Sequence, residues 1–366
     1  TDIEVENTSG GAILTYTPPS DQNLAYVQAV VNVPGGKVYE YKASPYNARI
    51  EIIGLGSADP QEVKLYSVSR CEKRSEPVSV TIHPLDPPYI GVYKSMELTE
   101  DFGGVNVKFE NISEAELALT LCVKNDKGEM EEVDTYFTEA KEGNFTWRGM
   151  DPIEKDFGVY IRDRWDNFSD TLYAKLTPLF EEELDKNKFR DLTLPGDAKI
   201  YTTEWNIAKV FLWNGTYGKE FAADGCYGDW LNMSTEGMVT NDPLWITIDL
   251  GQTAQLSRLR LNHYYTYQNK APRRYEIWGC TNEPPLDGSW DNWYKMAEHE
   301  QIKPSGLPVG SYGPGDEENW LAGDNITFSK DLPKTRYIRI KCLENWKGDT
   351  HMSIAEVTFY GSVVGN

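Results

Sequence analysis

Residues 336–341 read RYIRIK, and residues 353–361 read SIAEVTFYG. Both stretches are rich in the β-branched and aromatic residues that favour strands. An upstream stretch, residues 245–251, reads WITIDLG and has the same character. Together these stretches predict the strands of a β-sandwich at the C-terminal end of the chain.

The length and composition predict a multidomain β protein. A chain of 366 residues exceeds what one hydrophobic core usually organises, so we expect two or three domains. Apolar residues make up 40% of the chain and aromatic residues 12%, which excludes a disordered protein. Abundant Tyr, Trp, Val and Thr beside Gly and Pro favour strands and turns over helices.

The charge and the cysteines exclude several classes of function. With 57 acidic and 36 basic residues, the formal net charge of -21 would repel nucleic acid and anionic lipid. The five cysteines show no CxxC spacing, so we expect mostly buried free thiols and neither a zinc site nor a disulfide framework. No apolar run is long enough to span a bilayer.

The first half of the chain contains an internal repeat. Residues 63–85 align with residues 157–179 at a shift of 94, and residues 10–16 (GGAILTY) align with residues 103–109 (GGVNVKF) at a shift of 93. The matched residues include Tyr66 with Tyr160, Arg70 with Arg164 and Ser75 with Ser169. A repeat of about ninety residues indicates two copies of one structural unit.

Each repeat unit resembles a fibronectin type III or other immunoglobulin-like sandwich, because it consists of short alternating strands and has a Tyr late in the unit and a Pro at its end. The prolines of residues 86–88 mark a boundary, so we predict sandwiches over residues 1–87 and 88–178. Residues 179–194 form a predicted linker, in which residues 179–188 (LFEEELDKNK) have the charge pattern of a short helix. The repeats carry no catalytic constellation and are interpreted as a spacer.

The predicted third domain, residues 195–366, is rich in tryptophan. Nine of the eleven tryptophans lie there, which suits a surface on which sugar rings stack. A sandwich core also uses tryptophan. We therefore interpret Trp245, Trp278 and Trp293 as core residues, and His263 as a core histidine that continues an apolar alternation.

The strand-like stretches of this domain occur in the order of the discoidin family. They are residues 245–251, 257–261, 274–279 and 287–290, followed by the two final strands. The domain resembles discoidin-like domains, also called coagulation factor V/VIII type C or galactose-binding-like domains. With residues 303–310 (KPSGLPVG) and the upstream repeats, the whole chain resembles surface lipoproteins that gut bacteria encode with polysaccharide-utilisation systems.

The resemblance implies an all-β chain with two tandem immunoglobulin or fibronectin III-like sandwiches and a jelly-roll galactose-binding-like sandwich. It also implies that end loops bind a carbohydrate and that a structural calcium lies nearby. Glu356 would supply a calcium ligand from the last strand. Either Asp224 or the loop at Asn214 would complete that site, and a hard cation favours the anionic Asp224.

The predicted ligand-binding residues lie in two loops that mix aromatic and polar groups. Trp346 and Arg273 come first, because an indole stacks on a sugar ring and a guanidinium donates to vicinal hydroxyls. Tyr265, Tyr267 and His351 follow. Arg336 and Arg339 are expected to pair with carboxylates on a solvated strand face.

These patterns favour a binder over an enzyme, because no nucleophile, acid–base or metal motif occurs. We expect a non-catalytic glycan-binding protein that is an outer-membrane or cell-surface lipoprotein, with its anchor absent from this sequence. The expected partner is a polysaccharide or oligosaccharide. One alternative is a scaffold that binds other proteins of a surface complex, and another is an accessory or cryptic glycoside hydrolase.

Overall fold

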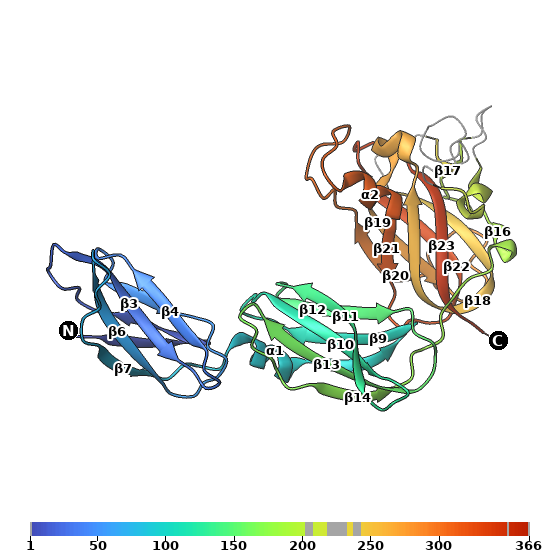
Figure 1. The fold of residues 1–366 in the computed structure, drawn as a ribbon. Coiled ribbons are helices and arrows are strands. Elements are labelled where there is room, and N and C mark those ends of the chain that lie inside the picture. Colours follow the sequence, from blue (N-terminus) through green and yellow to red (C-terminus); the bar gives the residue numbers. More distant parts are fainter. Residues whose placement is uncertain (1, 202–207, 218–232, 237–242, 350, 365–366) are drawn as a thin grey trace. The chain divides into compact units, whose positions relative to one another are not determined.

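The computed structural model describes residues 2–201, 208–217, 233–236, 243–349 and 351–364, with only the backbone at 265–267. The chain forms two compact units, Thr1–Leu179 and Phe180–Asn366. Both are built from β-sheets, and the described residues include two short α-helices, α1 (Pro88–Ser95) and α2 (Asp316–Ala322) (Figure 1). The predicted all-β fold class is confirmed.

The first sandwich packs a three-stranded sheet against a four-stranded sheet. The first sheet has the order β1-β2-β5 and the second β4-β3-β6-β7. Their bounds are β1 (Glu4–Thr8), β2 (Gly11–Thr15), β3 (Leu24–Asn32), β4 (Val38–Ala43), β5 (Arg49–Ile52), β6 (Gln61–Ser69) and β7 (Val78–Ile82). Apolar side chains of both sheets, such as Leu14, Val31 and Ile52, form a buried core.

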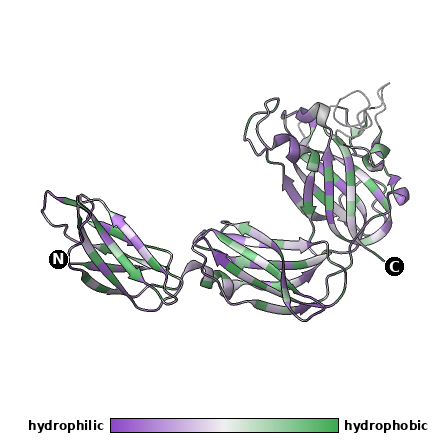
Figure 2. Ribbon diagram, in the orientation of Figure 1, coloured by the Kyte–Doolittle hydropathy of each residue, from purple (hydrophilic) through white to green (hydrophobic). Residues whose placement is uncertain are grey.

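The second sandwich repeats this plan with the sheets β12-β9-β8 and β11-β10-β13-β14. Its strands are β8 (Glu97–Asp101), β9 (Gly104–Glu110), β10 (Leu117–Lys124), β11 (Met130–Thr138), β12 (Glu142–Arg148), β13 (Lys155–Asp163) and β14 (Leu172–Leu176). Hydrophobic and hydrophilic residues alternate along many of these strands (Figure 2). The alternation directs one face into a core that contains Leu119, Trp147 and Val159.

Equivalent hydrogen bonds confirm the internal repeat. The hydroxyl of Ser75 accepts from the Ser67 amide at 3.0 Å, and that of Ser169 accepts from the Ile161 amide at 2.9 Å. Both pairs of residues differ by the shift of 94 found in the sequence. The equivalent glycines Gly10 and Gly103 also share a left-handed backbone, with φ of 62° and 64°.

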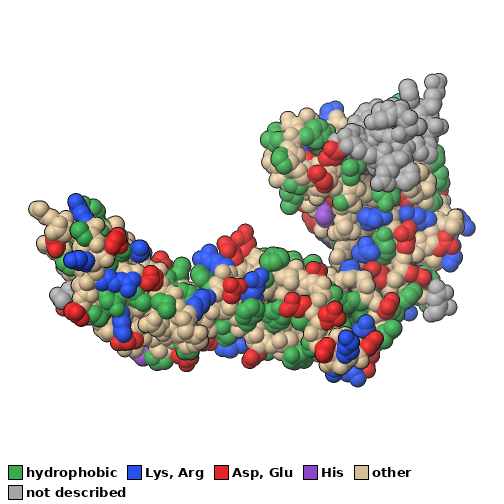
Figure 3. All heavy atoms as spheres, in the orientation of Figure 1, with side chains coloured by type: hydrophobic (Ala, Val, Ile, Leu, Met, Phe, Trp, Pro, Cys, Tyr) green, Lys and Arg blue, Asp and Glu red, His purple; other side chains and the backbone are tan. Residues whose placement is uncertain are grey.

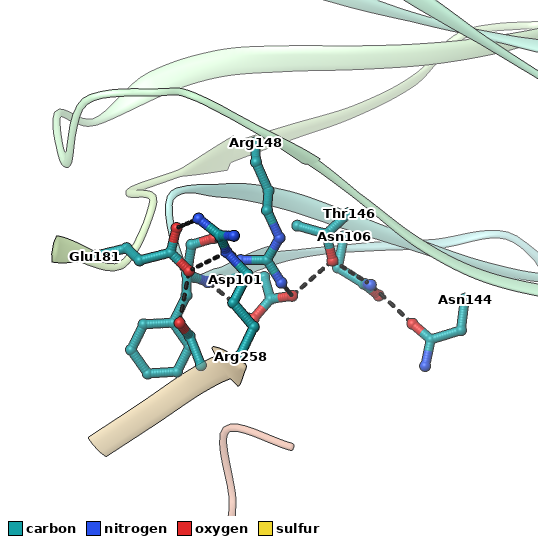
Figure 4. Close-up of polar contacts among 9 residues, drawn as sticks. Asp101, Asn106, Asn144, Thr146, Arg148, Glu181 and Arg258 are labelled. Carbon is teal, nitrogen blue, oxygen red and sulfur yellow. Dashed lines mark hydrogen bonds and ion pairs between the residues drawn. The ribbon is translucent and has the colours of Figure 1, made fainter. Parts of the chain in front are cut away.

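Polar side chains line the outer face of the sheet β12-β9-β8 (Figure 4). The amide of Asn106 donates to the Thr146 hydroxyl at 2.9 Å and to the Asn144 amide oxygen at 2.7 Å. Thr146 in turn donates to Asp101 at 2.6 Å. Basic, acidic and hydrophobic side chains are interspersed on the molecular face drawn in Figure 3.

The C-terminal sandwich has one extended sheet, in the order β15-β23-β18-β22-β19-β20, to which β16, β17 and β21 attach. The strands are β15 (Glu182–Glu183), β16 (Arg190–Asp191), β17 (Met233–Ser234), β18 (Leu244–His263), β19 (Pro272–Cys280), β20 (Tyr294–Glu300), β21 (Asp324–Thr327), β22 (Thr335–Asn345) and β23 (Ser353–Val363). Three 3₁₀-helices accompany them in the described residues, namely η1 (Lys186–Lys188), η2 (Lys209–Trp213) and η4 (Tyr265–Lys270). The main core includes Ile246, Leu259 and Phe359.

The segment after the second sandwich differs from the predicted helical linker. Residues 182–183 form β15, which pairs with β23, and residues 190–191 form β16, which pairs with β18. Only η1 is helical. Glu181 anchors the segment further, because its carboxylate accepts from the Ser257 hydroxyl at 2.6 Å and from Arg258 at 3.3 Å (Figure 4). Strand pairing and these bonds outweigh the helix-like charge pattern.

Cys122, Cys280 and Cys342 are buried free thiols, as predicted, whereas Cys71 is exposed and Cys226 lies outside the described residues. Burial raises the pKa of the Cys342 thiol to about 12. In the part of the chain that the structure describes, no helix is long and apolar enough to cross a membrane.

Candidate functional site

Two of the predicted ligand-binding residues, Arg273 and Trp346, lie side by side. Arg273 is at the start of β19 and Trp346 directly follows β22, and the pairing of Pro272 with Asn345 brings these strand ends together. The Arg273 guanidinium carbon lies 5.3 Å from the centre of the Trp346 ring. We call this pair the Arg–Trp corner.

The corner is polar and accessible. The Arg273 side chain is 40% exposed and forms ion pairs with Glu300 at 3.1 Å and Glu344 at 3.3 Å. Trp346 is half-buried. An indole, a guanidinium and two carboxylates therefore meet on one surface, and they offer a hydrophobic platform together with hydrogen-bond donors and acceptors.

A buried glutamine fixes both members of the corner. Gln301 is 2% exposed, and its side-chain oxygen accepts from the Trp346 indole at 2.6 Å. Its backbone amide donates to the carbonyl of Arg273 at 2.8 Å. Since a buried amide makes few alternative bonds, Gln301 restricts how the indole can turn.

Behind Gln301 lies a buried polar cluster centred on Asp324. Gln301 donates to Asp324 at 3.3 Å, Tyr275 donates at 2.6 Å, and Nε2 of His263 lies 2.7 Å away. Burial opposes the charge of Asp324, but the imidazole of His263 and the bonds from His299 and Tyr275 hold its pKa well below the usual range. His263 is 4% exposed, which confirms the interpretation as a core histidine.

His351 lies in the loop that follows Trp346. Asn345, which is 1% exposed, organises this loop because its amide donates to Asp349 at 2.6 Å and to the His351 carbonyl at 2.8 Å. The His351 ring is partly exposed, with Nδ1 3.2 Å from Asp349. Burial works against the charge of Asp349, yet hydrogen bonds from Asn345, Lys347 and His351 lower its pKa to about 2.

The other predicted residues fall partly outside the described atoms. The backbone of Tyr265 and Tyr267 lies in η4, but their side chains are not among the described atoms. Asp224 also lies outside the described residues. Their predicted roles stay predictions.

Glu356 is fully buried in β23, and among the described residues its carboxylate contacts Lys186 and Gly215. The ammonium of Lys186 lies 2.6 Å from one carboxylate oxygen, and the amide of Gly215 donates to the other at 3.1 Å. Among the described residues, the loop at Asn214 is therefore in contact with Glu356. Burial raises the pKa of Glu356 to about 7, although Lys186 and Gly215 act in the opposite direction.

This arrangement of Glu356 fits a buried ion pair better than a calcium site. Both oxygens already accept from donors, and a cation would have to displace the Lys186 ammonium. Among the residues that the structure describes, no group of three His, Cys, Asp or Glu side chains is placed to hold a metal. The calcium prediction, with Asp224 or the loop at Asn214, stays a prediction.

A second arginine lies in a different environment, where the prediction for Arg339 was wrong. Arg339 is fully buried, and it donates to the carbonyls of Gly288 and Ser289 at 2.9 and 3.1 Å. Its guanidinium carbon lies 4.5 Å from the ring centre of Trp290 and 4.4 Å from that of Trp293. Backbone carbonyls and aromatic rings replace the expected carboxylate, since the alternation directs this side chain into a cluster of tryptophans.

The remaining strand predictions follow the structure more closely. Arg336 forms a two-pronged ion pair with Asp249 at 2.8 and 2.9 Å, as predicted. Trp293 is 7% exposed, which confirms a core role. Trp245 and Trp278 are only partly buried, and each packs its ring edge to face against Trp290.

Comparisons with known proteins place the chain in a family. Three models, each described as a domain of unknown function, match consecutive parts of the chain: DUF4959 at residues 1–84, DUF5126 at residues 85–187 and DUF5000 at residues 217–361. A solved SusE-like protein shares 32% of its sequence over 76% of this chain and 100% of its own length, with a TM-score of 0.49.

The chain belongs to the SusE-like family. The curated proteins include no match. Other solved structures resemble parts of this SusE-like chain. The CBM32-3 module of a family 31 glycoside hydrolase from Clostridium perfringens is 17% identical, over 49% of this chain and 95% of the module, with a TM-score of 0.35. A two-domain fibronectin type III segment of chicken tenascin is 15% identical, over 48% of this chain and 98% of the segment, with a TM-score of 0.24.

Sequence reasoning missed the two residues that organise the corner of this SusE-like chain. Asn345 could have been recognised from the sequence, because Gly348 follows it three residues later. This spacing is typical of a turn in which the Asn side chain accepts a bond from the backbone. Gln301 carries no such signal. It follows an exposed, charged strand, and only the folded register shows that its side chain is directed inward.

Proposed function

We propose that this SusE-like chain is a non-catalytic glycan-binding protein of the cell surface, and that its C-terminal sandwich binds a carbohydrate at the Arg–Trp corner. The proposal includes an extracytoplasmic location as a lipoprotein of a polysaccharide-utilisation system. The sandwich repeats would act as a spacer between the anchor and the binding domain.

One observation carries the proposal: an accessible indole lies beside a guanidinium, and a buried glutamine fixes both. A pyranose ring has apolar faces that pack on an indole and hydroxyls that bond to forked donors and carboxylates. Trp346, Arg273, Glu300 and Glu344 supply these groups, and His351 lies in the next loop. A fixed platform loses little entropy when the ligand binds.

The family relationship supports the same proposal. The SusE-like relative covers 76% of the chain, and the tandem sandwiches with a C-terminal head are the arrangement expected of a display protein. A single shallow site of this kind would bind with a dissociation constant near 1 mM, or about -4 kcal/mol. Display of many copies on one surface would raise the avidity for a polymer.

The test is retention of the intact chain on immobilised polysaccharides. Galactan, galactomannan and mucin glycans are suitable probes, because a module of similar fold is described in complex with galactose, and amylose adds a glucose polymer for comparison. Released reducing ends are measured in parallel. Retention without cleavage supports a non-catalytic binder, whereas cleavage would move the chain to the accessory-enzyme alternative.

Trp346→Ala and Leu286→Ala form a matched pair for this test. Leu286 is 79% exposed and lies in the loop at the opposite end of β19 from Arg273. Trp346→Ala is expected to reduce retention at least tenfold, which corresponds to about 1.4 kcal/mol, and Leu286→Ala to leave it unchanged. Equal retention of both variants would remove the corner from the proposal.

The same assay tests the proposed calcium. If calcium is bound with Asp224, a chelator should reduce retention, and Asp224→Ala should abolish that sensitivity. Retention that is indifferent to chelator would favour Lys186 over calcium as the cationic partner of Glu356.

A further inference from the structure

The second sandwich contains a hollow that the proposed function does not use. The hollow measures about 430 Å³ and lies where β10 begins and β11 and β13 end. This volume falls within the roughly 300–1,000 Å³ typical of small-ligand sites. All the residues that line it belong to this one sandwich.

The hollow arises from one small residue between two large ones. Ala118 of β10 pairs with Phe137 of β11 on one side and with Arg162 of β13 on the other. Paired residues of neighbouring strands point to the same face of a sheet. The methyl group of Ala118 therefore forms a floor between an aromatic ring and a guanidinium.

Phe137 forms one wall of the hollow, and its exposure is unusual for an aromatic residue. Its side chain is 69% exposed, although phenylalanine is normally buried. At the shift of 93 residues between the two repeats, the first sandwich has a serine, Ser44, at the position equivalent to Phe137. The aromatic ring is thus not required by the shared sandwich architecture.

The rim mixes charges of both signs. Arg164 lies 3.7 Å from Glu116, and Arg162 lies 2.9 Å from Asp166, with the side chains of all four at least 42% exposed. Exposed ion pairs of this kind contribute little stability, on the order of 0 to 1 kcal/mol. Glu139 adds another carboxylate to the lining. These groups are therefore available to exchange partners with a ligand.

The lining indicates the class of ligand. An anion would need an excess of arginine, and a cation would need a larger excess of carboxylate, but the lining holds two arginines and three carboxylates, of which Asp163 already accepts from Asn167 at 2.8 Å. An exposed aromatic ring with forked donors and carboxylate acceptors suits a neutral polyhydroxyl compound. We propose that this hollow is a second carbohydrate subsite, in which a sugar ring packs on Phe137 and its hydroxyls bond to the arginines and glutamates of the rim.

Two variants of the intact chain test the subsite in opposite ways. Phe137→Ala removes the platform, and Ala118→Leu fills the hollow without removing any polar group. Tyr173→Ala is the matched control, because Tyr173 is 64% exposed on β14 of the same sheet and does not line the hollow. Melting curves verify that each variant folds.

The probes are galactan, galactomannan and amylose, and each variant is made in the wild-type chain and in Trp346→Ala. Phe137→Ala and Ala118→Leu should each reduce retention about fivefold on at least one polymer, and more strongly in the Trp346→Ala background. A loss with Phe137→Ala and Ala118→Leu but not with Trp346→Ala would support the subsite and overturn the proposed corner. Retention unaffected by both variants, or no retention of the wild-type chain, would overturn the subsite.

Discussion

Arg273 with Trp346 and Arg339 with Trp290 are the same pair of residue types in the same sandwich, but their surroundings differ. Arg273 is 40% exposed and faces two carboxylates that water also reaches. Arg339 is fully buried, and backbone carbonyls and indole rings are its closest partners. The first pair can exchange its partners for a ligand, whereas the second can do so only if the sandwich opens.

Burial, and not residue type, separates a binding group from a structural one in this sandwich. An exposed guanidinium keeps most of its hydration and loses little when its ion pair breaks. A buried guanidinium has given up its hydration and depends on every bond that replaces it. Burial also lowers the pKa of Arg339.

The largest expected effect comes from Arg339→Met, which keeps the length of the side chain and removes its donors. Two buried carbonyls and the Thr247 hydroxyl then lose a partner, so the free energy of unfolding of the C-terminal sandwich should fall by about 4 kcal/mol. Tryptophan fluorescence during urea unfolding measures this change, because nine of the eleven tryptophans follow residue 195 in the sequence. A loss below about 1 kcal/mol would mean that the buried guanidinium can be replaced with little effect on stability. Burial would then not distinguish Arg339 from Arg273.

Glu356 is a buried acidic group that differs from Arg339, because it has a charged partner, Lys186. The pKa of its carboxyl is 4.5 in the unfolded chain and about 7 in the folded sandwich, so the folded state binds more protons between these values. Its contribution to stability is therefore complete below about pH 4.5 and is lost as the pH rises through 7. The loss amounts to about 3 kcal/mol.

Urea unfolding of the wild-type chain and of Glu356→Gln at pH 5 and pH 8 isolates this term. The wild-type chain should lose more stability than the variant over this range, since the variant cannot ionise at that position. Parallel pH profiles of the two proteins would mean that Lys186 compensates fully for burial. Asp324 does not interfere, because its lowered pKa affects stability only when the pH falls below the ordinary carboxyl range.

Gln301 tests whether the exposed pair depends on a buried partner. Gln301→Leu removes the acceptor of the Trp346 indole but leaves both corner residues in place, so affinity for the retained polysaccharide should fall about tenfold. Gln301→Glu keeps the acceptor for the indole but loses the donor to Asp324, so it should restore only part of that affinity at neutral pH. A purely structural role would give equal affinities for the two variants whenever they are equally stable.

The sequence predicted most of the fold because period-two patterns and repeats are local properties. The shift of 94 between Ser75 and Ser169 was visible in the residues and corresponds to equivalent hydrogen bonds in both sandwiches. Residues 179–188 were predicted as a helix, because their charges suit one. Residues 182–183 instead pair with β23, which depends on contacts with residues more than 170 positions away.

The candidate site was predictable only in part. Trp346 and Arg273 were chosen from loops of mixed chemistry, and the structure brings them together. Their support by Gln301 and the burial of Arg339 were not predictable, since both depend on which strands become neighbours. A charged residue in an alternating strand carries no local sign of whether its partner will be a carboxylate or a cluster of rings.

The smallest expected effect, from Arg273→Lys, bears most directly on the comparison. Lysine keeps the positive charge for Glu300 and Glu344 but lacks the planar guanidinium fork. The free energy of unfolding should therefore change by less than about 1 kcal/mol. If a sugar binds at the corner, affinity should still fall about threefold to fivefold, because one ammonium cannot donate to two vicinal hydroxyls as a guanidinium does. Calorimetry with the retained polysaccharide measures the affinity, and the melting temperature reports stability. A variant that is less stable but binds normally would mean that Arg273, like Arg339, has a structural role although it lies at the surface.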